Sequence, residues 1–226
     1  FLPPFNPGNI RFRASLPESQ AVAVLGGSPY SYFRYETHLA ARQALPAYEQ
    51  LAEEFAAGFG RRYAAVEAYR CRDAEILLQM IGSFATKAKA AVERLRAAGQ
   101  AVGLLRPLLL GPFPDQALRQ ALRGKRGVAV IDQNLSFGLG GVLHSELASA
   151  LHGLADAPIL VSFIGGLGGR DIAPEEFFEI VHVTRQAVET GRIPPPRLLY
   201  TEDELRELRT LQTLAQVERN LLGNTQ

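Results

Sequence analysis

The sequence predicts an α/β protein, a three-layer α/β/α sandwich around a mixed, mostly parallel sheet of about five strands. Short apolar runs without polar alternation recur along the middle of the chain, and segments with helical periodicity separate most of them. Runs of this kind are typical of strands that helices cover on both faces of a sheet. The runs lie at residues 63–69, 74–81, 101–105, 127–132 and 158–164.

Four helices are expected between or after these strands, and each has a sequence signal at one end. Gly99 closes the first helix, while Asp115 follows a proline and can cap the second. Ser145 is expected to be the N-cap of the third, and Pro174 begins the fourth, in the turn that tolerates proline. The expected helices span residues 86–98, 115–122, 145–154 and 174–190.

The first two strands are joined by a connection too short to hold a crossover helix. Parallel neighbours need such a crossover, whereas antiparallel strands do not. We therefore expect residues 63–69 and 74–81 to be antiparallel or offset, which makes the sheet mixed.

The chain divides into four parts by composition. Residues 1–35 are rich in Pro, Gly, Asn and Ser and are expected to be an extended arm that docks on a neighbouring domain. Residues 36–61 form a helical connector in which Pro46 is expected to cause a kink or a split. Residues 62–192 are the α/β/α domain. Residues 193–226 are a Pro-rich spacer followed by an amphipathic helix with a leucine stripe.

Composition excludes several classes of function. The 24 basic and 23 acidic residues are mixed along the chain, which argues against a nucleic-acid partner. No apolar run approaches the length of a membrane span, and the first residues do not resemble a signal peptide, so a cytoplasmic protein is expected. The single cysteine, Cys71, predicts a reduced thiol with no disulfide or cysteine-ligated cluster within the chain. Phe1 is expected to follow further sequence or to result from processing.

Two glycine-rich loops follow predicted strands, at residues 132–141 and 165–171. Both lie where strands of open α/β sheets end and ligands bind. Neither loop matches the dinucleotide fingerprint or the Walker pattern. The glycines are explained either by positive φ and close packing, or by a backbone surface for another domain or a phosphate-bearing ligand. The residues predicted to form an interface are Gly168, Gly169, Arg170, Asp171, Ser136 and Gly138.

No catalytic residue and no metal site are predicted. None of the four histidines has another His or Cys at a metal-ligand spacing. His144 is close in sequence to Ser136 and Asp132, but the Gly-x-Ser-x-Gly turn of a Ser nucleophile is absent. The glutamates at 175 and 176 suit the first turn of a helix electrostatically.

An ordered series of short motifs nevertheless resembles one family. The motifs are Glu54-Phe55, Gly60-Arg61, Tyr63, Glu67, Tyr69, Asp73-Ala74-Glu75, Gly82-Ser83, Thr86, Ala90-Ala91-Val92, Leu95-Arg96, Gly99, Val102-Gly103-Leu104, Pro112-Phe113-Pro114, Leu122, Asp132, Asn134, Ser136, Gly138, Gly141, residues 165–171 and Pro174-Glu175. Over about residues 30–192 their order and spacing are similar to those of the α subunits of 2-oxoacid:ferredoxin oxidoreductases, most of all the pyruvate:ferredoxin (pyruvate synthase) branch.

The resemblance implies a domain of the transketolase C-terminal type, which follows a thiamine-pyrimidine domain. It implies a complex that converts a 2-oxoacid, CoA and oxidised ferredoxin to acyl-CoA, CO2 and reduced ferredoxin, or the reverse. Thiamine diphosphate, Mg and 4Fe–4S clusters are expected in the complete complex, and no cofactor is expected on this chain alone. The implied partners are ferredoxin, CoA and the subunits or domains that hold the thiamine pyrimidine and the diphosphate.

The sequence departs from the family pattern at two positions. Gly111 stands where a basic residue usually precedes Pro-Phe-Pro, and Gln133 stands where Arg often follows Asp132. Two alternatives to an enzyme subunit of the expected kind therefore stay open. One is a non-catalytic assembly protein with the same fold, and the other is a subunit of a thiamine enzyme with a different electron acceptor.

Overall fold

The structure is a computed structural model that describes residues 3–6, 15 and 26–223. The chain forms two compact units, Phe1–Ala44 and Leu45–Gln226. Most of the predicted N-terminal arm lies outside the described residues. None of the described helices is long and apolar enough to cross a bilayer.

Helix α1 (Gly27–Phe59) begins well before the predicted start of the helical connector at residue 36. The extended conformation expected for residues 27–35 is therefore wrong. The helix brings the hydroxyl of Ser31 to the carbonyl of Gly27 and that of Thr37 to the carbonyl of Phe33, each four residues back. Pro46 lies inside the helix without splitting it, on an exposed face where water can solvate the carbonyl that proline leaves unbonded.

The second unit is built on a six-stranded sheet in the order β1-β3-β2-β4-β5-β6. The strands are β1 (Val66–Tyr69), β2 (Ile76–Gln79), β3 (Val102–Pro107), β4 (Gly127–Asp132), β5 (Ile159–Ile164) and β6 (Arg197–Leu198). Strand β1 pairs antiparallel with β3, and all other pairs are parallel. The mixed, mostly parallel sheet is confirmed. Strands β1 and β2 run in opposite directions but are not neighbours, because β3 lies between them.

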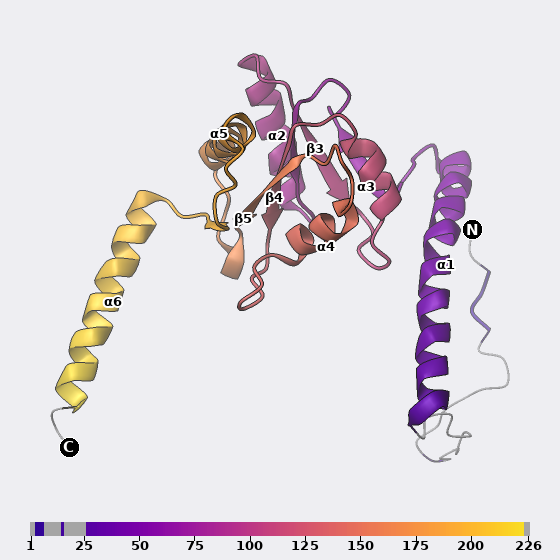
Figure 1. Ribbon diagram of the computed structural model, residues 1–226, viewed down its shortest axis with the longest axis horizontal. Helices are drawn as coiled ribbons and strands as arrows, with labels where there is room; N and C mark the ends of the chain where they lie inside the picture. The colour runs from indigo at the N-terminus through magenta and orange to yellow at the C-terminus, as the bar shows by residue number, and fades with distance from the viewer. Residues whose placement is uncertain (1–2, 7–14, 16–25, 224–226) are drawn as a thin grey trace. The chain divides into compact units, whose positions relative to one another are not determined.

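Helices cover both faces of the sheet and give the predicted three layers. Helices α2 (Phe84–Ala97) and α5 (Pro174–Thr190) pack on one face, and α3 (Asp115–Leu122) and α4 (Val142–Leu151) pack on the other (Figure 1). Each face has its own apolar core, with Phe163 and Phe177 buried in the first and Leu105 and Leu118 in the second. Each such side chain stabilises the fold by about 1.5–3 kcal/mol.

Helix α4 begins earlier than predicted. It starts at Val142 rather than at Ser145, and its N-cap residue is Gly141. The hydroxyl of Ser145 donates to the carbonyl of Gly141 instead of accepting from the helix. The cap is supplied from outside the helix by Asp132 at the end of β4. A carboxylate brought there by the sheet makes a charged bond that the local hydroxyl cannot match.

The C-terminal part holds one unexpected strand. The short β6 lies in the predicted Pro-rich spacer, where the N–H of Leu199 donates to the carbonyl of Ile164 at 2.8 Å. Helix α6 (Glu202–Gly223) follows and carries the predicted stripe of exposed leucines, which includes Leu205, Leu208 and Leu211.

Candidate functional site: the carboxyl edge of the sheet

Strands β2, β4 and β5 are parallel neighbours, so their carboxyl ends meet at one edge of the sheet. From β2 the chain moves to β3 on one side, whereas from β4 it moves to β5 and β6 on the other. The position between β2 and β4 is therefore the topological switch point, outside which open α/β sheets bind their ligands. Both predicted glycine loops emerge at this edge.

Asp132 ties the end of β4 to the start of α4. Its carboxylate accepts hydrogen bonds from the backbone N–H of Leu143 at 2.7 Å and of His144 at 3.1 Å. The side chain is only 2% exposed, and this burial raises its pKa, while the two N–H groups act in the opposite direction. Asp132 thus holds the N-terminus of α4 in place.

Gly141 makes this arrangement sterically possible. A Cβ on Gly141 would lie 2.0 Å from one carboxylate oxygen of Asp132 and 2.2 Å from its Cγ. The backbone angles of Gly141 are ordinary, with φ −77° and ψ 137°. Glycine is therefore needed here for space, unlike most of the glycines in the two loops.

The first glycine loop forms a small hairpin between β4 and α4. Ser136 and Gly140 exchange backbone hydrogen bonds of 2.9 Å in both directions. Gly138 and Gly140 have φ of 81° and 94°, and nothing lies within 4 Å of a Cβ added at either. The amide of Asn134 contacts the hydroxyl of Ser136 at 3.4 Å. These glycines allow left-handed turns, which is the first of the two explanations that the sequence left open.

A cavity of about 380 Å³ lies at the switch point. We call it the switch-point cavity. Its walls come from the ends of β2 and β4, the loop after β3 and the first turns of α4. The lining residues are Ile81, Leu110, Phe113, Asp132, Gln133, Asn134, Val142, Leu143 and Glu146. Sequence reasoning found one wall, the loop after Asp132, but not the apolar residues that complete it.

Gln133 joins the two strands at the switch point. Its amide Nε2 donates to the backbone carbonyl of Ile81, just after β2, at 2.9 Å. The Gln133 side chain also lies close to Gly82 and Gly166, where an added Cβ would be 3.6 Å and 3.4 Å from it. The residue that departs from the family pattern therefore packs between the loops that follow β2, β4 and β5.

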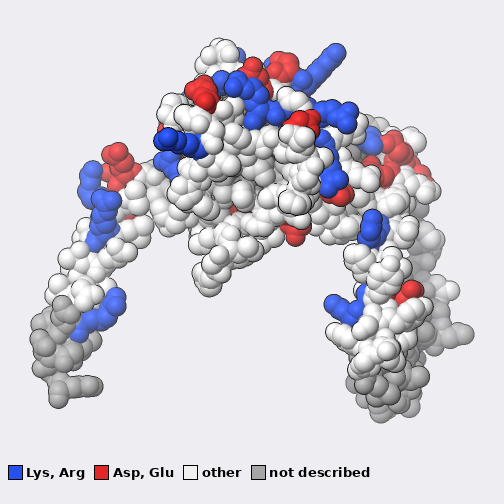
Figure 2. Space-filling view, viewed as in Figure 1, with Lys and Arg blue, Asp and Glu red and all other residues white. Residues whose placement is uncertain are grey.

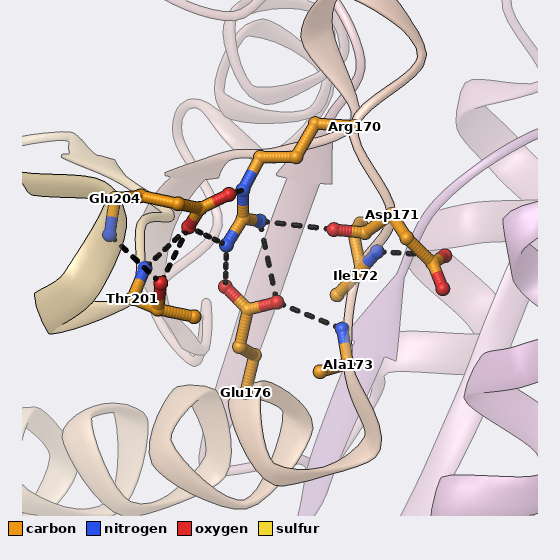
Figure 3. Close-up of polar contacts among 7 residues, drawn as sticks. All are labelled: Arg170, Asp171, Ile172, Ala173, Glu176, Thr201 and Glu204. Atoms are coloured by element: carbon orange, nitrogen blue, oxygen red, sulfur yellow. Dashed lines mark hydrogen bonds and ion pairs between the residues drawn. The ribbon is translucent and has the colours of Figure 1, made fainter. Parts of the chain in front are cut away.

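The second glycine loop is held by Arg170, whose guanidinium has a complete set of partners (Figure 3). Its Nε and Nη2 donate to the two carboxylate oxygens of Glu204, each at 2.6 Å. Nη1 and Nη2 donate to Glu176 at 3.2 Å and 3.0 Å, and Nη1 also donates to the carbonyl of Asp171 at 3.0 Å. All five N–H donors of the guanidinium are therefore used within the chain.

Each carboxylate that binds Arg170 also caps a helix. Glu176 accepts from the backbone N–H of Ala173 at 2.7 Å, before α5. Glu204 accepts from the N–H of Thr201 at 2.6 Å, while the Thr201 hydroxyl accepts from the N–H of Glu204 at 3.2 Å. This is a capping box, and the Thr-x-x-Glu spacing that announces it is readable in the sequence. We refer to Arg170, Glu176, Thr201 and Glu204 as the Arg170 cluster.

The rest of the second loop is ordered by one ion pair and by its glycines. Lys87 of α2 donates to the carboxylate of Asp171, which lowers the pKa of that carboxyl group. The Asp171 side chain also accepts from the N–H of Ile172 at 2.9 Å. Gly168 and Gly169 have φ of 63° and 82° with open space around them. The predicted interface residues of this loop thus lie together, between α2 and the start of α6.

The attachment of α6 to this loop is expected to weaken in acid. The ion pair with Arg170 lowers the pKa of Glu204 to about 2, from an ordinary value of 4.5. A carboxyl group with a lowered folded-state pKa stabilises the fold above its unfolded pKa, and that stabilisation is lost as the pH falls through the folded value. We expect the Glu204 carboxyl resonance to titrate near pH 2 and α6 to become protease-sensitive between about pH 4.5 and pH 2. Glu204→Gln is the control and should remove this pH dependence; a midpoint near 4.5 in the wild type would contradict the prediction.

The described residues at this edge show no cluster of side chains that fits a metal ion. No group of three or more His, Cys, Asp or Glu that could hold a metal ion occurs among them. Cys71 lies elsewhere, half-buried, with its thiol bonded to the carbonyl of Leu104 at 3.2 Å, and burial raises its pKa. Burial also disfavours the charged form of His144, and it therefore lowers the pKa of that histidine. The bond from His144 to Asp132 is made by its backbone N–H. We therefore assign no reaction step through thiamine diphosphate, Mg or an iron–sulfur cluster to these residues.

Comparisons with known proteins agree with the resemblance. The family model for the "Pyruvate:ferredoxin oxidoreductase core domain II" matches residues 74–177. The pyruvate synthase subunit PorA of Methanothermobacter thermautotrophicus is 41% identical over 155 residues, which cover 69% of this chain and 39% of that protein. PorA of Methanosarcina barkeri is 31% identical over 209 residues, with 91% and 51% covered.

Two further similarities are to proteins that are named for other 2-oxoacids. The ketoisovalerate oxidoreductase subunit VorA of Pyrococcus abyssi is 33% identical over 195 residues, covering 85% of this chain and 49% of that protein. Among solved structures, a 2-oxoglutarate:ferredoxin oxidoreductase from Magnetococcus marinus, with 2-oxoglutarate, coenzyme A and succinyl-CoA bound, is 22% identical with a TM-score of 0.41. It covers 60% of this chain and 21% of its own.

The chain spans between 39% and 51% of the length of the PorA and VorA relatives named above. The matched core domain lies within the second compact unit, from β2 into α5, and includes both glycine loops and the switch-point cavity. The chain belongs to the PorA-type α subunits of the 2-oxoacid:ferredoxin oxidoreductase family.

Proposed function

We propose that this chain is part of the α subunit of a thiamine-diphosphate-dependent enzyme that converts a 2-oxoacid, CoA and oxidised ferredoxin to acyl-CoA, CO2 and reduced ferredoxin, or runs in reverse. The observation that carries this proposal is the 41% identity to a pyruvate synthase subunit across most of the chain. Pyruvate is the proposed 2-oxoacid. The similarity to a ketoisovalerate oxidoreductase subunit makes a branched 2-oxoacid the substrate to compare with it.

Within that enzyme we assign the chain a structural role, the positioning of the thiamine domains. Three features support this. Both faces of the sheet are covered by apolar cores, the loops at the carboxyl edge are held by internal hydrogen bonds, and Asp132 and Glu176 at that edge cap helices. Thiamine diphosphate, Mg and 4Fe–4S clusters would then be held by other domains or subunits, and ferredoxin and CoA would bind the whole complex. The cytoplasmic location predicted from the sequence stays a prediction.

Gly168, Gly169, Arg170 and Asp171, with Ser136 and Gly138, remain the proposed interface residues. The five internal bonds of Arg170 define how it would contribute. Its guanidinium has no donor left for a partner, so Arg170 would act by ordering the loop. The glycine backbone and the exposed carboxylate of Asp171 would make the contact.

A second candidate function is a non-catalytic assembly protein with the same fold. The observation that favours it is the loss of two expected basic residues beside one cavity. Gln133 lines the switch-point cavity, and Gly111 follows Leu110, which also lines it. A subunit of a thiamine enzyme with another electron acceptor differs from the leading proposal only in its partners.

Purification of the native complex through a tag on this chain separates these functions. The enzyme proposal expects thiamine diphosphate and iron in the complex, and CoA-dependent reduction of ferredoxin with pyruvate or 2-ketoisovalerate. A complex with neither cofactor would support the assembly protein and contradict the enzyme proposal. Thiamine diphosphate with turnover on an artificial acceptor but not on ferredoxin would indicate the third possibility.

A further inference from the structure

The switch-point cavity has an apolar wall and an acidic rim. Leu110 and Val142 are 51% and 43% exposed at its mouth. Its charged lining residues are both acidic: Asp132 is buried and bonded to the start of α4, whereas Glu146 is exposed at the rim. No Lys or Arg is among the described residues that line it. A cavity with this lining favours an apolar group accompanied by a positive charge, and it disfavours phosphates and carboxylates.

The hairpin between β4 and α4 extends the apolar surface beyond the cavity. It leaves the cavity wall at Asn134 and returns to it at Val142. Its tip residue Phe137 is 97% exposed and Leu139 is 65% exposed, beside an exposed Leu135. The loop projects below the sheet in Figure 1, and the same lower rim of the α/β unit is mostly white in Figure 2, while charged residues of both signs gather along the upper rim. Contiguous exposed apolar side chains of this kind mark interaction sites.

We propose that the switch-point cavity and the tip of this hairpin form a docking site for a protein segment that presents an apolar side chain next to a lysine or arginine. The apolar side chain enters the cavity between Phe113 and Val142, and the cation pairs with Glu146 at the rim. The segment comes from another part of the same oxidoreductase, so the inference rests on the proposed function.

Two observations select a protein segment over a small ligand. A molecule that fits a cavity of about 380 Å³ would leave Phe137 and Leu139 in water, because they lie on the hairpin outside its lining. The relatives named above are also about twice as long as this chain, so the proposed enzyme has further protein that can supply the segment. The negative charge of Glu146 then favours a basic residue in that segment.

Cross-linking within the purified complex identifies the peptide that lies against the hairpin. Leu139 is replaced by the photoreactive residue p-benzoylphenylalanine, the complex is irradiated, and the cross-linked peptides are identified by mass spectrometry. We expect one dominant peptide from another domain or subunit, with an apolar residue beside a Lys or Arg. A peptide without a cation, a peptide from a second copy of this chain, or the absence of any cross-linked peptide would overturn the proposal.

Substitutions test the energetics of the same surface. Phe137→Ser and Glu146→Lys are each expected to weaken association of the chain with the rest of the complex about ten-fold. Glu146→Gln should have a smaller effect, because it removes the attraction without adding repulsion. The matched controls are Leu154→Ser and Asp156→Lys, which lie in the exposed connection from α4 to β5, before the amino end of β5. Association unchanged by all variants would contradict the docking site, as would equal losses in the controls.

The wild-type complex separates failure of this inference from failure of the proposed function. If it contains thiamine diphosphate and reduces ferredoxin while Phe137→Ser and Glu146→Lys assemble normally, the docking site is wrong and the function stands. If the complex lacks the cofactor but the variants fail to assemble, the docking site stands and the enzyme proposal is wrong.

Discussion

Replacement of Gly141 by alanine is expected to lower the free energy of unfolding of the α/β unit by about 3 kcal/mol. The added Cβ would lie 2.0 Å from a carboxylate oxygen of Asp132, so that carboxylate must leave the start of α4. The N–H groups of Leu143 and His144 would then lose their acceptor, and a nearly buried carboxylate would lose its donors. Denaturant unfolding of the wild type and the variant measures the difference.

Two further variants separate the clash from other effects of removing a glycine. Gly138→Ala changes a glycine of the same loop that has φ 81° but no neighbour within 4 Å, so it should cost only about 1 kcal/mol of backbone strain. Asp132→Ala removes the group that Gly141→Ala would strike. The double variant should therefore lose less than the sum of the single losses. Additive losses would show that the two positions are not coupled as described.

The same contact shows where local sequence patterns fail. Ser145 follows a loop and precedes an apolar run, which is a sound local signal for an N-cap. The actual cap comes from Asp132, which the sheet delivers from another element and which brings a full negative charge. The hydroxyl of Ser145 makes a weaker cap than this carboxylate, and the helix therefore begins earlier, at Val142. The sequence places Asp132 at a strand end, but it does not show where the side chain points.

Elements with strong local signals were predicted with their observed bounds. The helix at Asp115–Leu122, the strand at Gly127–Asp132 and the helix at Pro174–Thr190 each have a proline, a cap or an uninterrupted apolar run that marks their ends. The position of β3 between β1 and β2 has no such signal, because strand order depends on the packing of the connecting helices. Strand β6 was missed for a similar reason, since two residues after a run of prolines pair only because Ile164 lies beside them.

The candidate site was predicted in part. The loops that carry Ser136, Gly138 and Arg170 were found because glycines cluster after apolar runs. The switch-point cavity was not found, because its wall also needs Leu110 and Phe113 from the loop after β3. Nor could the sequence join Arg170 to Glu204, which lies 34 residues away and begins another helix. The pair forms because β5 and β6 are neighbours in the sheet, which brings the residues that follow these two strands close together.

Replacement of Arg170 by alanine is expected to lower the free energy of unfolding by about 2 kcal/mol and to release the start of α6. The guanidinium side chain is 18% exposed and bridges Glu176 and Glu204, which are 12% and 35% exposed. Without it, two neighbouring carboxylates repel each other, and the link between the second glycine loop and α6 is lost. Denaturant unfolding gives the stability, and limited proteolysis between residues 199 and 205 reports the release of the helix.

Two control variants, Arg170→Lys and Arg197→Ala, test whether the loss of stability depends on the planar guanidinium of the Arg170 cluster. Lysine keeps the charge, but its single ammonium cannot reproduce five donors in a plane, so it should recover less than half of the loss. Arg197 forms an exposed ion pair with Glu179, in which the side chains are 47% and 52% exposed, and its removal should cost no more than about 0.5 kcal/mol. An equal cost for Arg170→Ala and Arg197→Ala would mean that the Arg170 cluster is an ordinary surface ion pair.

A larger cost for Arg170→Ala, with increased cleavage, would mean that one side chain couples the order of the glycine loop to the attachment of α6. Any partner that contacts Gly168, Gly169 or Asp171 would then bind more weakly to the Arg170→Ala variant, although Arg170 itself has no donor free to touch it.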